Sequence, residues 1–367
     1  MARVKVAVYA IAKNEIKHVE RWAQATAGAD YRIVADTGST DGTQEALKAL
    51  GVDVHQIHLK PFRFDDARNA ALTLVPEDAD VCLILDMDEV PEPNFFDKVR
   101  KSWKTGTDHG WISVKTGENQ WERDRLHSRF GWRWKYPCHE VNVWYDTRAT
   151  RDCDLRSAVI EHLPDNSKSR GQYLELLELA VKEYPTDARM WTYMCREYFF
   201  YQKWQEVITS ATKKLECGGW DVESAAVCRW AGEAAHQLGN EEDARTWYDK
   251  GADILPTQGE PWFGVAIDAY RKQEWQRCLD ASLNAMERTR SNHYCYESAV
   301  WDWKAYDLAG ISAYNLKHID EAITFTIEAL KANGPEQERI ERNLNFYKEV
   351  KNAKPSIRVS PTQQQSN

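Results

Sequence analysis

The stretch Val81-Cys82-Leu83-Ile84-Leu85-Asp86-Met87-Asp88-Glu89 decides the fold, because an apolar run is followed at once by a cluster of acidic residues. A continuous apolar run of this length is typical of a strand that is buried on both faces of a sheet. Carboxylates placed directly after such a strand need water, cations or a metal ion to compensate their charge. A hard divalent ion that joins Asp86 and Asp88 to a diphosphate would do so. The same residues could also form a solvated acidic loop at the end of a strand, without a metal ion. This stretch alone therefore leaves both interpretations open.

Upstream of this stretch, short apolar runs alternate with segments of helical spacing. We expect strands over 4–11, 31–35, 52–58 and 81–85, and helices over 15–27, 43–50 and 65–74. Strands separated by helices predict a mostly parallel sheet covered on both faces. In such sheets ligands bind beyond the carboxyl ends of the strands, which is where the polar motifs of this sequence lie. Residues 1–165 are therefore predicted to form a Rossmann-like α/β domain.

From about residue 169 onward the sequence shows only helical periodicity. Self-similarity recurs at about the 34-residue period of tetratricopeptide repeats. The small, aromatic and terminating positions of the two clearest units are occupied by Ala244, Tyr248, Pro256, Gly310, Ala322, Ala329 and Pro335. We predict an all-α repeat domain over 166–352 and a disordered tail over 353–367. Most tryptophans of the repeats are expected to pack in the core, with a subset lining a concave recognition face.

Composition limits the class of protein. The 367 residues include 48 Lys and Arg against 57 Asp and Glu, and the net charge of −9 disfavours indiscriminate binding to polyanions. The eight cysteines contain no CxxC pair, so we expect reduced, buried residues rather than a disulfide framework or a zinc site. No apolar run is long enough to span a membrane, and the first residues are typical of a strand rather than a signal peptide. We therefore expect a cytoplasmic protein.

Three further motifs accompany the acidic one. Ile11-Ala12-Lys13-Asn14-Glu15 follows the first strand, Asp36-Thr37-Gly38-Ser39-Thr40-Asp41-Gly42-Thr43 follows the second, and Phe64-Asp65-Asp66-Ala67-Arg68-Asn69-Ala70 opens the third helix. Glycine permits a tight turn in the second motif, and Asp, Ser and Thr cap the helix that follows it. The four motifs resemble those of the family 2 glycosyltransferases of the GT-A fold, where KNE, DxGSTDGT, ARN and DxDE segments occur in this order.

The resemblance implies a nucleoside-diphosphate-sugar donor, with UDP as the expected nucleotide. It places Asp36 on the base, Arg68 on the base or the diphosphate, and Asp86 toward the ribose and the donor sugar. It places the rest of the nucleotide-sugar site at Ala12, Asn14, Glu15 and Ser39. Asp88 would ligate a Mn²⁺ or Mg²⁺ ion, and His162 would be a further ligand that suits Mn²⁺ better.

The acceptor side is expected at His139-Glu140, because relatives with attached repeats carry a similar segment. A carboxylate beside the acceptor would take its proton, so Glu140 is the first candidate for the general base, with Asp88 and Glu89 as rivals. His139 would orient Glu140 or touch a phosphate. A purely structural role remains open for this pair, and also for Glu89, which would then pair with an arginine.

Arg129 and Trp134 lie in a stretch, 121–135, in which basic residues alternate with aromatic ones. Arginine can bind a phosphate through two hydrogen bonds, and indole can stack on a sugar or a base. The stretch therefore supplies candidates for contacts with the phosphate and the acceptor, including a nucleic acid. A solvated hairpin over packed tryptophans is the equally expected alternative.

The resemblance predicts metal-dependent transfer of a sugar, expected to be a hexose, with inversion. The attached repeats are similar to those of a subgroup that includes a peptide S-glycosyltransferase of bacteriocin biosynthesis. They imply a homodimer or a macromolecular acceptor, which stays open among peptide, protein, envelope glycan and modified DNA base. A binding scaffold with a degenerate nucleotide-sugar domain is disfavoured by the intact Asp86 and Asp88. A nucleotidyltransferase is disfavoured because no glycine-rich phosphate loop lies near the first strand.

Overall fold

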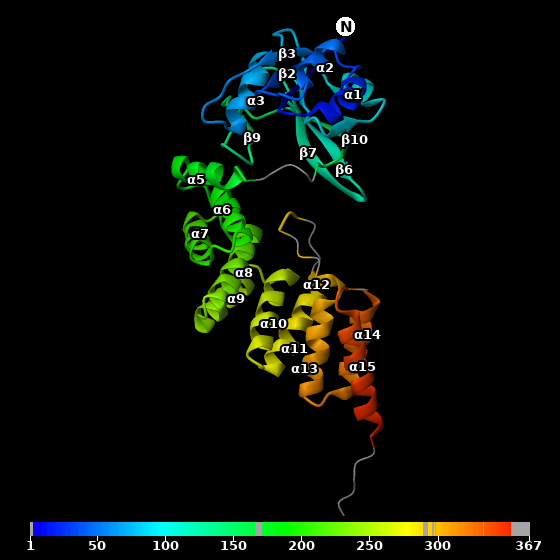
Figure 1. The fold of residues 1–367 in the computed structure, drawn as a ribbon, viewed down its shortest axis with the longest axis vertical. Helices are drawn as coiled ribbons and strands as arrows, with labels where there is room; N and C mark the ends of the chain where they lie inside the picture. The colour runs from blue at the N-terminus through cyan, green and yellow to red at the C-terminus, as the bar shows by residue number, and fades with distance from the viewer. Residues whose placement is uncertain are drawn as a thin grey trace, which may run out of the picture. The chain divides into compact units, whose positions relative to one another are not determined.

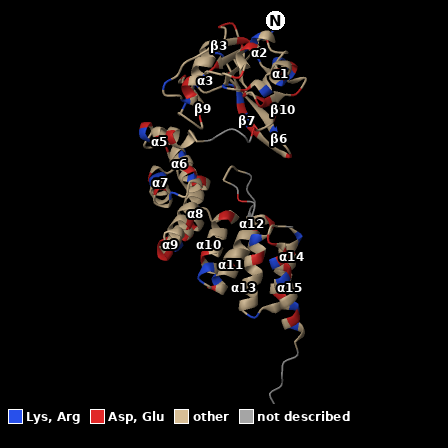
Figure 2. Cartoon of the chain, in the orientation of Figure 1, with Lys and Arg blue, Asp and Glu red and all other residues tan. Residues whose placement is uncertain are grey.

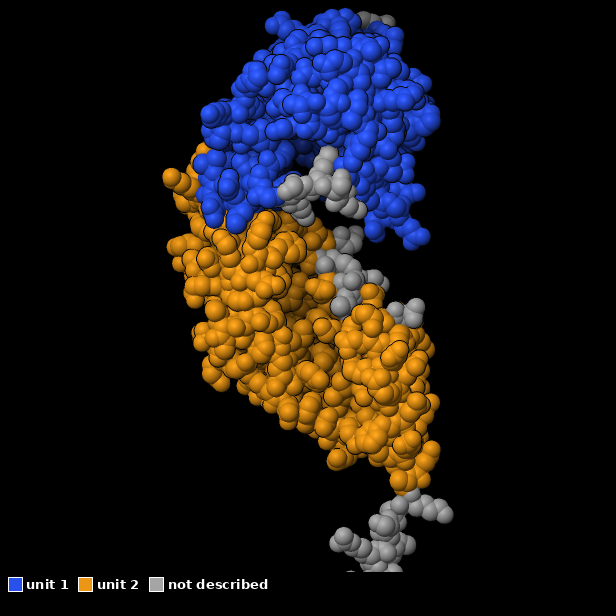
Figure 3. All heavy atoms as spheres, in the orientation of Figure 1, with its two compact units in different colours: residues 1–180 blue, residues 181–367 orange. Residues whose placement is uncertain are grey.

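The computed structural model describes residues 3–165, 171–288, 293–295, 297, 299–332 and 334–353. The chain divides into two compact units, Met1–Ala180 and Val181–Asn367, each of which is described by itself (Figure 3). The predicted domain boundary after residue 165 stays a prediction, because residues 166–170 lie outside the described part. The predicted tail over 353–367 also lies outside it, except for Ala353. Among the described residues, no helix has the length and apolar character needed to cross a membrane.

The first unit is built on an eight-stranded sheet of order β3-β2-β1-β4-β7-β6-β10-β5 (Figure 1). Its strands are β1 (Val6–Ala12), β2 (Tyr31–Asp36), β3 (Asp53–Gln56), β4 (Val81–Ile84), β5 (Glu89–Pro91), β6 (His109–Thr116), β7 (Asn119–His127) and β10 (Asp152–His162). A separate two-stranded sheet contains β8 (Trp132–Lys135) and β9 (Val141–Trp144). Strands β1 to β4 are parallel and β10 is parallel to β6, whereas β7 is antiparallel to both neighbours and β5 to β10. The predicted mostly parallel sheet is confirmed, with an antiparallel part that was not predicted.

Helices cover both faces of this sheet. They are α1 (Ile16–Ala25), α2 (Thr43–Ala49), α3 (Phe64–Thr73) and α4 (Phe95–Ser102). Val6, Val8 and Ala10 of β1 pack in one core with α1, α2 and α4, whereas Ala7 and Tyr9 pack in the other core with α3. Successive side chains of a strand point to opposite faces, so β1 contributes to both cores and its sequence is apolar throughout.

The described part of the second unit is helical. Its helices are α6 (Ala188–Phe200), α7 (Trp204–Cys217), α8 (Asp221–Gln237), α9 (Glu241–Ile254), α10 (Gly259–Arg271), α11 (Trp275–Glu287), α12 (Ala299–Asp302), α13 (Lys304–Asn315), α14 (Ile319–Lys331) and α15 (Gln337–Asn352), and α5 (Tyr173–Glu183) spans the division between the units. Helices pack as the successive hairpins α6–α7, α8–α9, α10–α11 and α13–α14. The helical character predicted after residue 169 is confirmed.

The four hairpins share one turn. In each hairpin, the residue two positions before the second helix has a positive φ. These residues are Gln202, Gly239, Gln273 and Lys317. The next residue donates its N–H to the carbonyl oxygen five residues earlier, as from Lys203 to Tyr198 at 3.0 Å. The corresponding donors Asn240, Glu274 and His318 make the same bond at 2.9 Å. Four copies of one turn confirm that this unit is built from helical repeats.

Small and aromatic residues fit together inside the repeats. A Cβ atom on Gly232 or Gly264 would lie 2.9 Å or 2.6 Å from the ring of Tyr248, so glycine lets the neighbouring helices approach this ring. The predicted small positions Ala244, Ala322 and Ala329 are completely buried. A groove of about 720 Å³ in this unit is lined by aromatic side chains that include those of Phe199, Trp204, Trp230 and Tyr270.

Acidic and basic residues are interspersed along α14 and α15 (Figure 2). Some pair across helices, as Lys351 does with Asp320 at 2.6 Å and Arg339 with Asp307 at 2.6 Å. The exposed pair Lys351–Asp320 contributes up to about 1 kcal/mol, whereas Asp307 is buried and its pairing with Arg339 offsets the cost of that burial.

Candidate active site

The motifs that follow β1 and β2 are joined by hydrogen bonds. The N–H of Asn14 donates to Ser39 Oγ at 2.8 Å, and Asn14 Oδ1 accepts from the N–H of Thr40 at 2.8 Å. The N–H of Glu15 donates to Thr43 Oγ1 at 2.8 Å. Asn14 has a left-handed φ of 56°, which asparagine adopts more readily than most residues. The carbonyl oxygen of Ala12 accepts from the N–H of Thr37 at 2.9 Å, so the structure brings the predicted nucleotide-side residues of both motifs together.

Asp36, the last residue of β2, is completely buried and organises the turn that follows it. Its Oδ1 accepts from the N–H of Gly38 at 2.9 Å, from the N–H of Ser39 at 2.8 Å and from Gln44 Nε2 at 2.8 Å. Its Oδ2 accepts from Ser39 Oγ at 2.5 Å. These bonds occupy most of the acceptor capacity of a carboxylate. Asp36 therefore shapes the loop, and its direct contact with a base stays a prediction.

The guanidinium of Arg68, on α3, joins the acidic motif to the segment before β9. Its Nη1 donates to Asp86 Oδ1 at 2.9 Å and its Nε donates to Glu140 Oε1 at 2.5 Å. Arg68 is buried, and its guanidinium lies over the indole of Trp134 at 5.2 Å. Burial raises the pKa of Asp86, but the charges of Arg68 and Arg125 outweigh burial and lower this pKa to about 2. Three predicted site residues from distant motifs thus meet at one guanidinium.

Glu89 is buried behind the acidic turn. Its Oε2 accepts from the N–H of Asp86 at 2.9 Å, and its Oε1 accepts from Arg125 Nη2 at 2.7 Å. Glu89 thus pairs with an arginine, as the structural alternative expected, and its role stays a prediction. Arg125 was not predicted as a site residue, although its place among the alternating basic and aromatic residues of β7 was a signal that it faces one side of the sheet.

Asp88 and His162, the predicted metal ligands, face each other. Asp88 Oδ2 lies 3.6 Å from His162 Nε2, and His162 Nδ1 lies 3.2 Å from Thr116 Oγ1. The N–H of Leu163 donates to the carbonyl oxygen of Asp88 at 2.9 Å, which joins the end of β10 to the acidic turn. The hydrogen bond with Asp88 raises the pKa of His162, although burial opposes this shift.

These two side chains fit a metal ion that takes its other ligands from water and a substrate. Among the described residues, no group of three or more His, Cys, Asp or Glu side chains could hold an ion. Two atoms 3.6 Å apart can still bind one ion, since ligand distances to Mg²⁺ are about 2.1 Å. Such ions are commonly held by one or two carboxylates together with substrate phosphates. The donor set therefore fits a site that is completed by a diphosphate.

The turn before Glu140 has an unusual backbone. Tyr136 and His139 have φ values of 83° and 51°, which non-glycine residues adopt rarely and at a cost of about 1–3 kcal/mol. The N–H of Phe64 donates to the carbonyl oxygen of Pro137 at 2.9 Å, and the ring of His139 packs against that of Tyr173. These contacts hold the turn so that Glu140 reaches Arg68.

Two predicted contact residues, Trp134 and Arg129, make structural contacts within the first unit. Trp134 is buried, and its Nε1 donates to Tyr9 Oη at 2.9 Å, so its indole supports Arg68 and presents no face for a sugar. Arg129 donates from Nε to the carbonyl oxygen of Val75 at 2.9 Å. Val75 lies between α3 and β4, whereas Asp86 follows β4. The contact of Arg129 with a phosphate stays a prediction.

His127 closes a buried hydrogen-bond chain behind Trp134. Its Nδ1 donates to the carbonyl oxygen of Ser128 at 2.8 Å, so its Nε2 accepts from Tyr9 Oη at 2.7 Å. Burial lowers the pKa of His127 from 6.5 to about 4. The unfolded chain thus binds a proton that the folded chain excludes. We expect the unfolding free energy of the first unit to fall by about 3 kcal/mol as the pH falls from 6.5 to 4.

The variant His127→Gln should reduce this pH dependence, because glutamine stays neutral over the whole range. Urea unfolding at pH 7 and pH 4, monitored by hydrogen exchange of the β1 amides, would measure the difference in unfolding free energy between the two pH values. The matched control is His58→Gln, because His58 is an exposed histidine of the same unit. An equal loss of stability in wild type and His127→Gln would show that other groups cause the acid dependence.

Comparison with known proteins matches residues 16–159 to the model of Glycosyl transferase family 2. No curated protein matches the chain. Among solved structures, the crystal structure of the APC/C hetero-tetramer Cut9–Hcn1 is 15% identical at a TM-score of 0.40, covering 49% of this chain and 33% of that chain. The crystal structure of MamA protein is 16% identical at a TM-score of 0.37, covering 45% and 82%. A MamA structure from Desulfovibrio magneticus RS-1 is 15% identical at 0.37, covering 45% and 85%.

This chain spans about a third of the Cut9–Hcn1 chain, and all three structural similarities are too low to bear on function. The assignment therefore rests on the family match, on the hydrogen bonds that join the first motif to the second and the third to the fourth, and on the repeated turn of the second unit. Residues 16–159 form a glycosyl transferase family 2 domain, which this chain joins to tetratricopeptide-like helical repeats.

Proposed function

We propose that this chain transfers a hexose with inversion from a nucleoside diphosphate, with UDP as the expected nucleotide, to a macromolecular acceptor. The transfer would depend on Mn²⁺ or Mg²⁺. The observation that carries the proposal is the meeting of Arg68 with Asp86 and Glu140, next to the pair Asp88–His162. Membership of residues 16–159 in the family supports sugar transfer itself.

Charge balance supports the need for a divalent cation. The four carboxylates Asp86, Asp88, Glu89 and Glu140 outnumber the guanidinium groups of Arg68 and Arg125. A diphosphate would add negative charge to this set, so its binding without a further cation would be unfavourable. Asp88 and His162 would hold the ion, which when bound would neutralise charge on the departing diphosphate.

The side chains of the site have separate roles in the proposed reaction. Arg68 would bind phosphate oxygens, which would compete with Asp86 and Glu140 for its guanidinium. Glu140 would take the proton of the acceptor group as that group attacks the anomeric carbon. The bond from this carbon to the diphosphate oxygen breaks as the new bond forms. Inversion is what the family resemblance implies for such a direct displacement.

A second candidate function, a binding scaffold, is favoured by the groove of about 720 Å³ in the second unit. Its lining of aromatic and charged side chains is suited to holding a polypeptide or a second copy of the chain, so the repeats would recruit the acceptor or form a homodimer. The eight cysteines are free and six are buried, which supports the reducing cytoplasm as the proposed location.

A thermal-shift screen tests the donor site. UDP-, GDP-, CMP- and dTDP-sugars would each be added with and without Mn²⁺ or Mg²⁺. One nucleotide should stabilise the chain only together with a metal, by about 2.7 kcal/mol at a hundredfold excess over its Kd. The variant Asp86→Ala should lose this shift, because it removes the carboxylate that joins the acidic turn to Arg68.

The matched control is Asp97→Ala, which changes a highly exposed aspartate of the same unit. A shift produced by the nucleotide without metal would refute the metal dependence. The absence of a shift with every pair would favour the scaffold function.

A further inference from the structure

A cavity of the first unit lies at the sheet edge opposite the candidate active site. It has a volume of about 530 Å³, and its lining includes Val4 and Asp80, which precede β1 and β4, and Phe130, which follows β7. Asp86 and Asp88 follow the other end of β4. We call this space the rear cavity. Its volume suits a small ligand, since ligand pockets commonly measure about 300–1,000 Å³.

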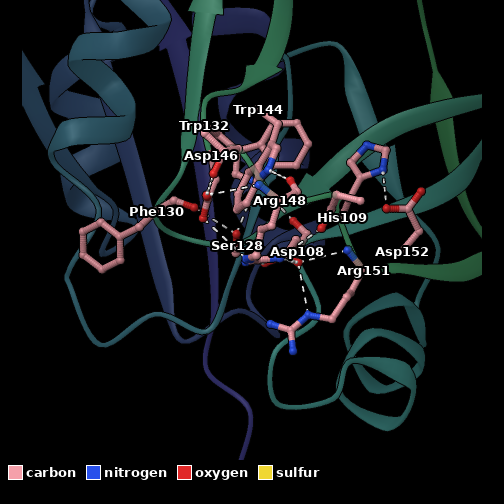
Figure 4. Close-up of polar contacts among 12 residues, drawn as sticks. Asp108, His109, Ser128, Phe130, Trp132, Trp144, Asp146, Arg148, Arg151 and Asp152 are labelled. Atoms are coloured by element: carbon pink, nitrogen blue, oxygen red, sulfur yellow. Dashed lines mark hydrogen bonds and ion pairs between the residues drawn. The ribbon is translucent and has the colours of Figure 1, made fainter.

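A network of hydrogen bonds fixes the walls of the rear cavity (Figure 4). Asp108 is buried and accepts from Nη1 and Nη2 of Arg148 at 2.6 and 2.7 Å. The guanidinium of Arg148 lies over the ring of Trp144 at 4.8 Å, and Trp144 Nε1 donates to the carbonyl oxygen of Arg148 at 2.8 Å. Trp132 Nε1 donates to the carbonyl oxygen of Asp108 at 3.1 Å. A ligand would therefore meet walls that are already ordered, which lowers the entropy cost of binding.

The charges that line the rear cavity balance. Its cationic residues are Arg3, Lys104, Arg129 and Arg148. Its acidic residues are Glu77, Asp80, Asp108 and Asp146. Binding of nucleic acid depends on an excess of positive charge, which this lining lacks. The lining therefore favours an uncharged polar ligand.

Two aromatic side chains near the rear cavity are unusually exposed. Phe130 and Tyr145 are 58% and 59% exposed, more than any other large hydrophobic side chain described in the first unit. The N–H of Tyr145 donates to the carbonyl oxygen of Gly131 at 2.8 Å, so the backbones beside the two rings are joined. In Figure 4 the ring of Phe130 points away from the ion-pair network. Aromatic faces beside fixed polar groups are suited to a ligand with apolar and polar sides.

We propose that the rear cavity binds a neutral oligosaccharide. The C–H faces of a pyranose ring would pack on Phe130 and Tyr145, and its hydroxyl groups would bond the charged side chains of the lining. The site would hold a glycan away from the point of sugar transfer. It goes beyond the proposed transfer reaction and does not require it.

Isothermal titration calorimetry of the full chain tests this site with cellohexaose, maltohexaose and chitohexaose as probes. At least one probe should bind, and Phe130→Ala and Tyr145→Ala should each weaken it by about tenfold. Both side chains are exposed, so neither variant should affect folding. The matched control is Phe200→Ala, which removes an exposed phenylalanine of the second unit and should leave binding unchanged.

The variant Asp88→Ala separates the two sites, because it should bind the oligosaccharide as the wild type does even if sugar transfer is lost. The proposal is overturned if none of the three probes binds at about 10 mM, well above the Kd of a weak specific site. It is also overturned if binding survives both Phe130→Ala and Tyr145→Ala. Self-association seen by light scattering, and lost in these two variants without any oligosaccharide binding, would assign the surface to a second copy of the chain.

Discussion

Asp88→Ala is expected to lower the rate of sugar transfer by at least about a thousandfold at saturating Mn²⁺. Asp88 is the carboxylate that lies nearest His162, with 3.6 Å between Oδ2 and Nε2. Its loss would leave the imidazole as the one side chain of the pair able to ligate an ion. The turnover number should be measured as a function of Mn²⁺ concentration with the donor identified by thermal shift.

The fold should survive this change, because the bond from Leu163 to residue 88 uses the carbonyl oxygen of the backbone. Asp97→Ala is again the control, since Asp97 is an exposed aspartate of the same unit. If Asp88→Ala keeps full turnover with the same dependence on Mn²⁺, the assignment of Asp88 to the metal is wrong. A lost turnover that excess Mn²⁺ partly restores would locate the defect in metal affinity.

The meeting of the four motifs could be predicted because each lies next to an end of a strand or helix in an α/β pattern. The carboxyl ends of parallel strands share one edge of a sheet, so Asn14, Asp36 and Asp86 had to lie on the same side. Local periodicity was sufficient for β1, β2 and β4, whose apolar runs are short and bounded by polar residues. Strand order and elementary geometry thus place these motifs at one edge of the sheet, whereas the roles of their residues come from the resemblance to family 2 glycosyltransferases.

Partners far apart in the sequence could not be predicted. The alternating pattern of 121–135 indicates strands, but it does not say which strand pairs with which. The antiparallel pairing of β7 with β4 is therefore an outcome of tertiary packing. Trp134 was predicted to contact a ligand because the sequence does not show its contact with Tyr9, which lies 125 residues away in the chain. The pairing of Arg125 with Glu89 could not be predicted for the same reason, since the two residues are distant in the chain.

The turns of the repeats show a different limit of sequence analysis. Of the four residues with positive φ, only Gly239 is of the type that favours this conformation, and Gln202, Gln273 and Lys317 are not. The packing of each helix pair therefore determines the turn, and the residue type does not reveal it. The spacing of small and aromatic residues was the stronger signal, because it reports helix packing directly.

Glu140→Gln is expected to lower the turnover number by about 10²–10⁴-fold while donor binding persists. Glutamine has the size of glutamate, and its amide oxygen can still accept from Arg68 Nε, so the site should keep its geometry. What is lost is the ability to take a proton. The matched control is Glu122→Gln, which changes an exposed glutamate that pairs with Arg156 at 2.8 Å.

The dependence of kcat/KM on pH separates a general base from an anchor for Arg68. If Glu140 is the base, the wild type should lose rate at low pH, and this loss should be absent from the residual activity of Glu140→Gln. If Glu140 only holds Arg68, the variant should keep this acid limb and its donor affinity should change instead. An unchanged acid limb would transfer the role to Asp88, because Glu89 is buried and its carboxylate bonds Arg125 and the backbone of Asp86. Asp88→Asn would then be the next variant, with the same pH profile as its measurement.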